Sequence, residues 1–296
     1  MNRIVNAMTV DVEDYFHASA FDRGVSRAAW DQLESRVVPN TRRLLDIFSA
    51  HDLRATFFVL GWVADKFPSL VKDISAAGHE LASHGFHHQL VYLLTPSQFR
   101  EDVRRSKDTI EQIAGVPVRG YRAPSFSIVK QSLWALDVLI EEGFSYDASI
   151  FPIRHDRYGI ADAPRHAHMI QRASGSILEM PSSTVRVGQT NYPIAGGGYF
   201  RLFPYAMTKW GITQVNTADQ QPVMLYIHPW EVDPEQPRLP ASMAAQLRHH
   251  VGMNTTIDKL NRAIDDFAFG PVRDVIKART TGIVTATPRL APASLP

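Results

Sequence analysis

The chain has 296 residues, of which 45% are apolar and 21% are charged, so its composition is that of an ordinary globular protein with enough apolar residues for one large core. Lysine and arginine number 31 against 30 aspartate and glutamate residues, and this balance excludes an overall field that would attract nucleic acid or an anionic membrane. The absence of cysteine excludes disulfides, thiolate metal ligands and a cysteine nucleophile, so any metal site must use nitrogen and oxygen.

The first residues, MNRIVNAMTVDV, carry one basic side chain and an apolar run that is too short and too interrupted for a signal-peptide core or a membrane span. The sequence as written therefore predicts a cytoplasmic protein without an integral membrane segment.

Strand and helix patterns alternate along the chain. Short apolar runs predict strands over residues 3–12, 55–60, 80–83, 116–121, 144–147 and 222–228. Between them, helices are expected from near Pro39 and over residues 62–77, 95–114 and 133–142, the third opened by a capping box of Thr95 and Gln98. Residues 154–199 read as loops and short β-like pieces, and two helical segments are expected near Ala241 and Ile257. Repeated strand-helix units predict a parallel sheet or barrel.

An acidic cluster, Asp11, Glu13 and Asp14, lies where the first expected strand ends. Active sites of parallel α/β folds are assembled at the carboxyl ends of their strands, so this position favours a functional role. Acidic residues at a strand end are, however, more often solvated loop residues or helix caps.

Two histidines, His84 and His88 in SHGFHHQL, follow the third expected strand. Their separation of four residues is able to place both imidazoles on one side of a helical turn, where they would chelate a divalent ion. The alternative is that they are surface histidines.

Two further polar residues also stand at expected strand ends. His228 in LYIHPW is suited to act as a general acid because histidine titrates near neutrality, unless it is only a hydrogen-bonded loop residue. Arg122 in GYRAPSF is suited to pair with a carboxylate and keep it ionised.

Five segments in this order, TVDVEDYF, SHGFHHQL, GYRAPSF, FSYDASIF and LYIHPW, resemble the polysaccharide deacetylase family, the fourth carbohydrate esterase family. The opening segment, with GGGYFRLFP and FGPVRDVI, resembles the subgroup associated with bacterial exopolysaccharide export and exosortase systems. The resemblance implies an α/β fold, a distorted (β/α)7 barrel, in one catalytic domain over residues 1–296. Its core would span about 5–230, followed by an extension over 231–284 and a flexible tail over 285–296.

The resemblance also implies the role of each site residue. Asp11 matches the catalytic base, Arg122 the arginine that orients it, and His228 the general acid. His84 and His88 match the metal-binding histidines, and Asp147 matches the acid that supports His228, although the tryptophan that usually follows it is missing.

The metal carboxylate is ambiguous because the two adjacent aspartates of the family's first motif are not present. Asp14 has the expected side chain and is preferred, whereas strand periodicity favours Glu13, which lies on the same side as Asp11. Zinc is the default metal for a nitrogen and oxygen site, with cobalt, nickel and iron as alternatives.

Two aromatic residues are candidates for contact with a sugar chain. Tyr199 follows three glycines that would let the backbone approach a ligand, and Trp230 follows the acid histidine. The alternatives are a plain loop for the first and packing beneath the loop for the second.

These assignments predict a metal-dependent hydrolase that removes N-acetyl groups from a polysaccharide, an oligosaccharide or a precursor, in bacterial exopolysaccharide biosynthesis and in association with an export assembly. One alternative is a hydrolase of a small cyclic amide or a lipid-linked sugar on the same fold. Another is an inactive carbohydrate-binding subunit, which would not need Asp11, both histidines, Arg122 and His228 together.

Overall fold

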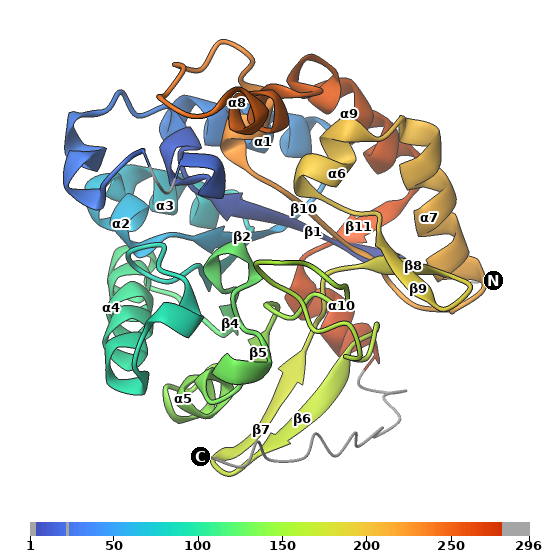
Figure 1. The fold of residues 1–296 in the computed structure, drawn as a ribbon, viewed down its shortest axis with the longest axis horizontal. Helices are drawn as coiled ribbons and strands as arrows, with labels where there is room; N and C mark the ends of the chain where they lie inside the picture. The colour runs from blue at the N-terminus through green and yellow to red at the C-terminus, as the bar shows by residue number, and fades with distance from the viewer. Residues whose placement is uncertain (1–3, 22–23, 280–296) are drawn as a thin grey trace.

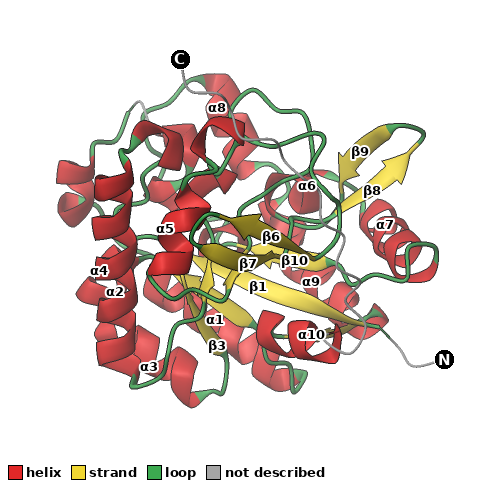
Figure 2. Cartoon of the chain, turned by 90° about the horizontal axis from the view of Figure 1, so that it is seen from below, coloured by secondary structure: helices red, strands yellow, loops and turns green. Residues whose placement is uncertain are grey.

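A twisted sheet of mostly parallel strands crosses the centre of the molecule, and helices surround it (Figures 1 and 2). The computed structural model describes residues 4–21 and 24–279. Strands lie in the order β10-β1-β2-β3-β4-β5-β7-β6, and β11 also pairs with β1. Their bounds are β1 Val5–Val12, β2 Thr56–Val59, β3 Glu80–Ser83, β4 Gly120–Tyr121, β5 Tyr146–Asp147, β6 His168–Arg172, β7 Gly175–Glu179, β10 Met224–Ile227 and β11 Ala268–Gly270.

The predicted α/β architecture is confirmed, with seven parallel strands from β10 to β7 and an antiparallel β6 at one edge. The hydrogen-bonded path does not return from β7 to β10, so among the described residues the distorted barrel stays open on this side. Single contacts bridge the gap: the Met224 amide donates to Ser183 Oγ at 2.7 Å, and Gly196 forms an isolated parallel bridge with Tyr226.

The helices follow the strand-helix alternation of the sequence. Their bounds are α1 Val37–Ala50, α2 Gly61–Lys66, α3 Pro68–Ala76, α4 Pro96–Ala114, α5 Ala135–Glu141, α6 Gly197–Leu202, α7 Tyr205–Thr217, α8 Met243–His250, α9 Thr256–Asp266 and α10 Val272–Arg279. The α4 helix begins at the expected capping box, where the Thr95 amide donates to Gln98 Oε1 at 2.9 Å. The helix expected over residues 62–77 is two helices, because Pro68 lacks an amide hydrogen and restricts Phe67.

The expected loop region over residues 154–199 contains more sheet than its pattern suggested. It forms the hairpin β6–β7 and a second hairpin, β8 Thr184–Val187 with β9 Thr190–Pro193. The β7 strand pairs with β5 in parallel, with Glu179 opposite Asp147. In contrast, the strand expected over residues 116–121 shortens to its last two residues. The predicted tail over residues 285–296 lies outside the described residues.

Strand register brings the chemistry-bearing residues to one edge of the sheet. Asp11 of β1 pairs with Phe58 of β2, and Val59 pairs with Ser83, the residue before His84. Ser83 pairs with Tyr121, the residue before Arg122, and Val10 pairs with Ile227, the residue before His228. The carboxyl ends of these parallel strands therefore assemble one site.

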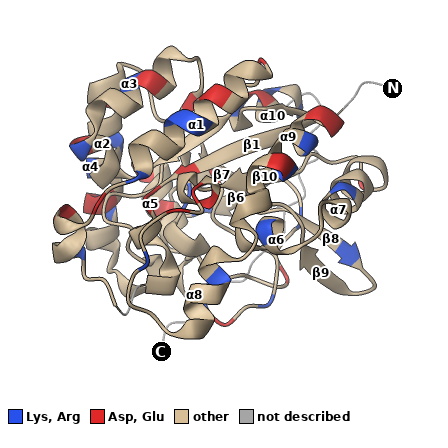
Figure 3. Cartoon of the chain, turned by 90° about the horizontal axis from the view of Figure 1, so that it is seen from above, with Lys and Arg blue, Asp and Glu red and all other residues tan. Residues whose placement is uncertain are grey.

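Charged residues of both signs are scattered over the ribbon without a continuous region of one sign (Figure 3). Within residues 4–21 and 24–279, no helix combines the length and the apolar character that crossing a membrane requires.

Candidate metal and catalytic site

Glu13, His84 and His88 bring three donor atoms within 4.8 Å of one another. Glu13 Oε2 lies 2.6 Å from His88 Nε2 and 3.8 Å from His84 Nε2, and all three side chains are largely buried. Burial by itself would raise the pKa of Glu13, but His88, with His228 and His84, outweighs burial and holds the pKa below its usual range. An ionised carboxylate beside two imidazoles is a donor set that fits zinc or a similar divalent ion.

The two histidines are positioned by a loop and not by the helical turn that their spacing suggested. His84 follows β3 directly, and Gly85 and His88 have φ angles of 73° and 51°, in the left-handed region. Asp102 of α4 fixes this loop by accepting the Phe86 amide at 2.7 Å and the His87 amide at 3.0 Å. The loop turns the chain back so that the rings of His84 and His88 lie 5.4 Å apart.

The tautomer of His84 follows from its contact with the backbone. His84 Nδ1 lies 2.9 Å from the Arg122 carbonyl oxygen, which can only accept, so Nδ1 carries the proton. Burial lowers the pKa of His84 to about 4, which keeps the ring neutral near pH 7. Its Nε2 lone pair is thus available to a metal, as in many histidine sites where the second nitrogen is bound by a carbonyl.

Asp14, the expected metal carboxylate, does not join this cluster. Its Oδ1 accepts the Tyr15 amide at 3.0 Å, and its Oδ2 accepts Ser35 Oγ at 2.5 Å and the Val37 amide at 3.2 Å. Both oxygens also contact the Arg36 amide. Asp14 therefore caps a short 3₁₀ helix, η1 Tyr15–His17, and the start of α1. Glu13, the alternative, lies beside the histidines.

Asp11 and Arg122 form a buried ion pair on the inner face of the sheet. Arg122 Nη1 donates to Asp11 Oδ1 at 2.5 Å and to Thr9 Oγ1 at 3.0 Å. The guanidinium is fully buried and stacks 4.1 Å from the centre of the Phe58 ring. Because a planar guanidinium with several partners has little freedom, it holds the Asp11 carboxylate in one orientation.

His228 faces both carboxylates from the opposite side. Its Nε2 lies 3.8 Å from Asp11 Oδ2 and 3.7 Å from Glu13 Oε1, while its Nδ1 lies 3.1 Å from Glu231 Oε2. Burial alone would lower the pKa of His228, but Glu231, Glu13 and Asp11 outweigh it and raise the pKa to about 9. His228 is therefore suited to hold a proton at neutral pH.

The acidic side chain that contacts His228 Nδ1 in the structure is Glu231, whereas Asp147 lies in a different contact. Glu231 lies in the 3₁₀ helix η7 Pro229–Val232, three residues after His228, and also accepts Arg201 Nε at 2.6 Å. Asp147 is buried on β5 and hydrogen-bonds to Glu179 and Ser149. The acidic neighbour of His228 thus comes from the turn after β10.

Residues 13–139 match the family model described as polysaccharide deacetylase, and residues 148–277 match a model described as a domain of unknown function, DUF3473. Residues 13–139 belong to the polysaccharide deacetylase family.

Relatives and solved structures agree with this family. The chain is 28% identical over 119 residues to a peptidoglycan-N-acetylglucosamine deacetylase of Bacillus cereus, a match covering 36% of this chain and 43% of that protein. It is 34% identical over 110 residues to a peptidoglycan deacetylase of Helicobacter pylori, covering 36% of each. The chain thus spans well under half of these relatives. A putative polysaccharide deacetylase from Mycobacterium smegmatis has the same fold, with a TM-score of 0.63, 20% identity and coverage of 100% and 97%.

In this deacetylase fold, Trp230 and Tyr199 occupy different environments. Trp230 is buried; its Nε1 donates to Glu13 Oε1 at 3.1 Å, and its ring stacks on His228 at 5.0 Å and His249 at 4.4 Å. It therefore supports the site from beneath. Tyr199 is half-buried at the edge of an aromatic cluster with Phe126, Phe151, Ile153, Tyr158 and Tyr226.

Two of the three glycines before Tyr199, Gly196 and Gly197, serve the packing of this cluster. A Cβ on Gly196 would lie 2.1 Å from Tyr226 Cδ1, and a Cβ on Gly197 would lie 2.9 Å from its Cε2. Both glycines also have positive φ angles. They leave room for the Tyr226 ring, whose edge lies against His228, with ring centres 5.7 Å apart.

Sequence reasoning did not assign roles to Arg201 and His17. Arg201 pairs with Glu231, and no local pattern marked it. His17 is buried, contacts Trp30 and Trp62, and accepts the Asp14 amide on Nδ1 at 2.9 Å. His17 stands three residues after Asp14, a spacing that is typical of a capping box and would have indicated its contact with the Asp14 amide.

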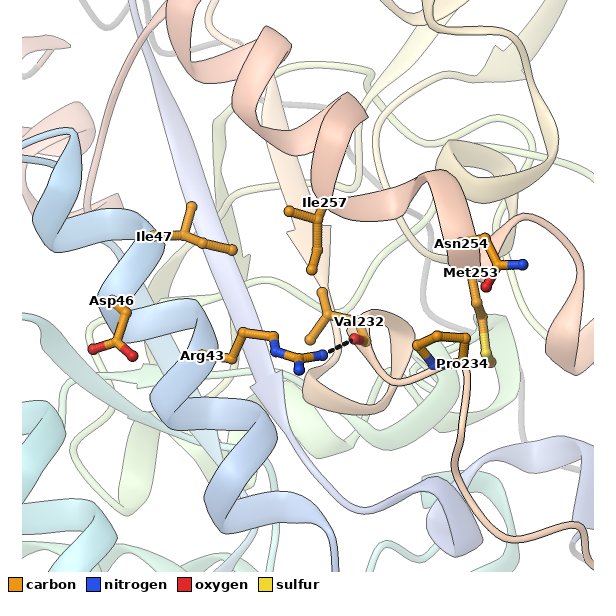
Figure 4. Close-up of a pocket in the computed structure, with 8 residues that line it drawn as sticks. All are labelled: Arg43, Asp46, Ile47, Val232, Pro234, Met253, Asn254 and Ile257. Atoms are coloured by element: carbon orange, nitrogen blue, oxygen red, sulfur yellow. Dashed lines mark hydrogen bonds between the residues drawn. The ribbon is translucent and has the colours of Figure 1, made fainter.

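A hollow of about 450 Å³ lies between α1, η7 and the start of α9 (Figure 4). It is lined by Arg43, Asp46, Ile47, Val232, Pro234, Met253, Asn254 and Ile257. Its arginine, Arg43, already donates to the Val232 carbonyl oxygen at 2.7 Å. None of the candidate site residues Asp11, Glu13, His84, His88, Arg122 and His228 lines this hollow.

Proposed function

We propose that this protein is a divalent-metal-dependent deacetylase that hydrolyses N-acetyl groups of a polysaccharide or its precursor. The observation that carries the proposal is the convergence of three units at one edge of the sheet. These units are the donor set of Glu13, His84 and His88, the Asp11–Arg122 ion pair, and the His228–Glu231 pair. Amide hydrolysis needs an activated water, stabilisation of an oxyanion and protonation of the leaving nitrogen, and these units match those needs.

Glu13, His84 and His88 would hold the metal, with zinc as the first candidate. When bound there, the ion supplies a Lewis acid that polarises the acetyl carbonyl. Asp11 accepts the proton of the attacking water, and Arg122 holds the Asp11 carboxylate in the orientation that this transfer needs. His228 Nε2 donates a proton to the departing nitrogen, while Glu231 holds the opposite nitrogen of the ring.

The substrate class is part of the proposal. The named relatives are peptidoglycan deacetylases, which supports an N-acetylated sugar chain as substrate. The resemblance of the opening motif and of FGPVRDVI to the exopolysaccharide-associated subgroup favours a bacterial exopolysaccharide or its precursor, handled with an export assembly. Tyr199, at the edge of the aromatic cluster, is the candidate for stacking on a sugar ring.

Acetate release from a panel of oligosaccharides tests the proposal. The panel contains N-acetylated exopolysaccharide fragments, peptidoglycan fragments and a cyclic amide, each assayed with chelator and with zinc, cobalt, nickel or iron added. We expect metal-dependent acetate release from a sugar substrate. Asp11→Asn should retain metal and fold but lose activity. Turnover of the cyclic amide alone would favour the alternative hydrolase, and absence of turnover with every metal and substrate would contradict a deacetylase.

A further inference from the structure

Asp147 and Glu179 form a buried pair of carboxyl groups that the proposed mechanism does not use. They lie opposite each other on the parallel strands β5 and β7, and both side chains are fully buried. The two carboxyl groups hydrogen-bond to each other. Apart from this contact, Asp147 Oδ2 and Glu179 Oε2 have no hydrogen-bond partner in the described part of the chain.

A hydrogen bond between two carboxyl groups requires a proton on one of them, because two carboxylates can only accept. Among the described residues, neither group forms a direct ion pair with a lysine, arginine or histidine, and the charge of Arg122, which favours ionised Glu179, is outweighed by burial and by Asp147. Burial raises the pKa of Asp147 to about 6, and burial together with the Asp147 charge raises the pKa of Glu179 well above its usual value. The pair therefore carries one shared proton near neutral pH, with Glu179 as the protonated member.

The pair fixes the backbone that follows β5. Glu179 Oε1 accepts the Ile150 amide at 3.0 Å, and Asp147 Oδ1 accepts Ser149 Oγ at 2.5 Å. Ser149 Oγ in turn accepts the Ala123 amide at 2.8 Å. The segment over residues 147–150 is thus tied at two points to the carboxyl pair.

This segment holds Arg122, the residue that orients the catalytic base. The Ala148 carbonyl oxygen accepts Arg122 Nε at 3.3 Å, while the Ser149 contact fixes the neighbouring Ala123 amide. Arg122 Nη1 contacts Asp11, and the Arg122 carbonyl oxygen accepts His84 Nδ1. A displacement of residues 148–150 would consequently misplace both Asp11 and a metal-site histidine.

We propose that Glu179 is a positioning residue that shares a proton with Asp147, fixes residues 148–150 and thereby holds Arg122 against Asp11. The proposal deepens the deacetylase function above and rests on it for its kinetic effect. It gives Asp147 a role different from support of His228.

Three variants test the proposal in the full-length protein loaded with zinc. Glutamine in Glu179→Gln keeps an oxygen for the Ile150 amide and an NH₂ donor for Asp147, so this variant should retain most of the activity. Glu179→Ala loses both contacts and should lower kcat about 10- to 100-fold with little change in KM, since small errors in catalytic geometry cost factors of this size. Glu80→Ala is the matched control. Glu80 is a buried glutamate at the start of β3, bound to Thr56 and Tyr146, so its loss should lower Tm but not kcat.

The shared proton has a second readout that does not depend on turnover. A carboxyl group whose pKa is raised on folding stabilises the fold at low pH, and this stability is lost as the pH rises through the raised pKa. The Tm of the wild-type protein should therefore fall more steeply than that of Glu179→Gln as the pH rises above the usual pKa of glutamate toward the raised pKa of Glu179, because glutamine has no proton to lose. Glu80→Gln, measured in parallel, shows how much the loss of a different buried glutamate, Glu80, changes the pH dependence of Tm.

The results separate the two proposals. If the wild-type protein releases no acetate, the deacetylase function fails, while the comparison of Tm profiles still decides whether the carboxyl pair shares a proton. Parallel Tm profiles of the wild type and Glu179→Gln, or equal losses of kcat in the glutamine and alanine variants, would overturn the role of Glu179. Wild-type kcat in a folded Glu179→Ala would overturn it as well.

Discussion

The site depends on how two acidic residues that are adjacent in sequence point in opposite directions. Glu13 reaches His84 and His88, whereas every polar atom of the Asp14 side chain is engaged by Ser35 and backbone amides. A carboxylate with this many donors stabilises the loop through its hydrogen bonds and has little freedom to bind a metal. Residue type alone favoured Asp14 as the metal ligand, whereas the directions of the two side chains favour Glu13.

Alanine substitutions at these two positions should have opposite effects. Glu13→Ala removes the only carboxylate of the described donor set and should abolish stoichiometric zinc binding. Asp14→Ala leaves buried donors unsatisfied, so it should cost about 1–3 kcal/mol of stability while keeping the metal. Calorimetric zinc titration and thermal unfolding of both variants measure the two effects. Metal loss in Asp14→Ala with retention in Glu13→Ala would restore Asp14 as the ligand.

Protonation of His228 is set by its neighbours. With Glu231, Glu13 and Asp11 around it, its pKa is raised to about 9, and Arg201 and His228 together hold the pKa of Glu231 at about 2 despite burial. Since His228 must be protonated to donate a proton, activity should fall on the alkaline side as the ring loses its charge. Glu231 contacts His228 Nδ1, whereas Nε2, the other ring nitrogen, lies near Asp11 and Glu13.

Glu231→Gln should move the alkaline limb of the kcat/KM profile to lower pH. Glutamine removes the negative charge that raises the pKa of His228, so the ring deprotonates earlier. His228→Ala should lower kcat/KM about 10²- to 10⁴-fold and lose this limb. Initial rates across pH for both variants and the wild type provide the measurement. Retention of the alkaline limb in His228→Ala would mean that another group titrates there.

At the scale of elements, loops after the strands are held in place by the surrounding helices. The loop that carries His84 and His88 has two residues in the left-handed region, and α4 fixes it through Asp102. Thr95 and Gln98 predicted the capping box that begins α4. They gave no indication that the first turns of this helix would anchor the histidine loop. Periodicity indicates which face of a helix is buried and not which loop lies on it.

Asp102→Ala should loosen the histidine loop. Its loss leaves the Phe86 and His87 amides without their buried acceptor, which should cost about 1–3 kcal/mol of stability. Zinc affinity should fall as well, because His84 and His88 are no longer held at the same distance. Asp108→Ala, an exposed aspartate on the same helix, is the control and should change neither quantity. Unchanged zinc affinity in Asp102→Ala would show that the loop holds its shape without this anchor.

At the scale of the whole molecule, the two regions matched by separate family models share one sheet. The central strand β1 has β2 on one side, whereas its neighbours on the other side are β10 and β11, from residues 224–227 and 268–270. His228 with its supporting Glu231 and Arg201 also comes from the second region, while Asp11, Glu13, His84 and His88 come from the first half. The complete set of catalytic groups therefore exists only when both regions are folded together.

Removal of metal should lower the stability of the whole fold. A ligand that binds only the folded state stabilises it by about 2.7 kcal/mol when present at 100 times its dissociation constant. We therefore expect Tm to rise with added zinc and to fall with a chelator, since Glu13 follows β1 whereas His84 and His88 lie on the loop after β3, and a shared metal would join these two segments. Scanning calorimetry of the wild type and of His84→Ala checks this effect. A rise of equal size in His84→Ala would place the zinc elsewhere.

The sequence by itself determined the α/β class, the alternation of strands and helices, and the order of polar residues at strand ends. These features follow from local periodicity and from the chemistry of Asp11, His84, His88, Arg122 and His228, which register then brings to one edge. Local patterns go far here because the buried strands of a parallel sheet are mostly apolar, and the polar residues singled out lie at or just beyond their carboxyl ends.

Only the tertiary structure decided which partners each acidic side chain contacts. Glu13 rather than Asp14 lies beside the histidines, because Ser35 and the backbone at the start of α1 engage Asp14. Glu231 rather than Asp147 contacts His228, and β7 places Glu179 opposite Asp147 in a different pair. In each case a residue distant in sequence competes for the side chain, and such competition is settled by packing and burial rather than by local pattern.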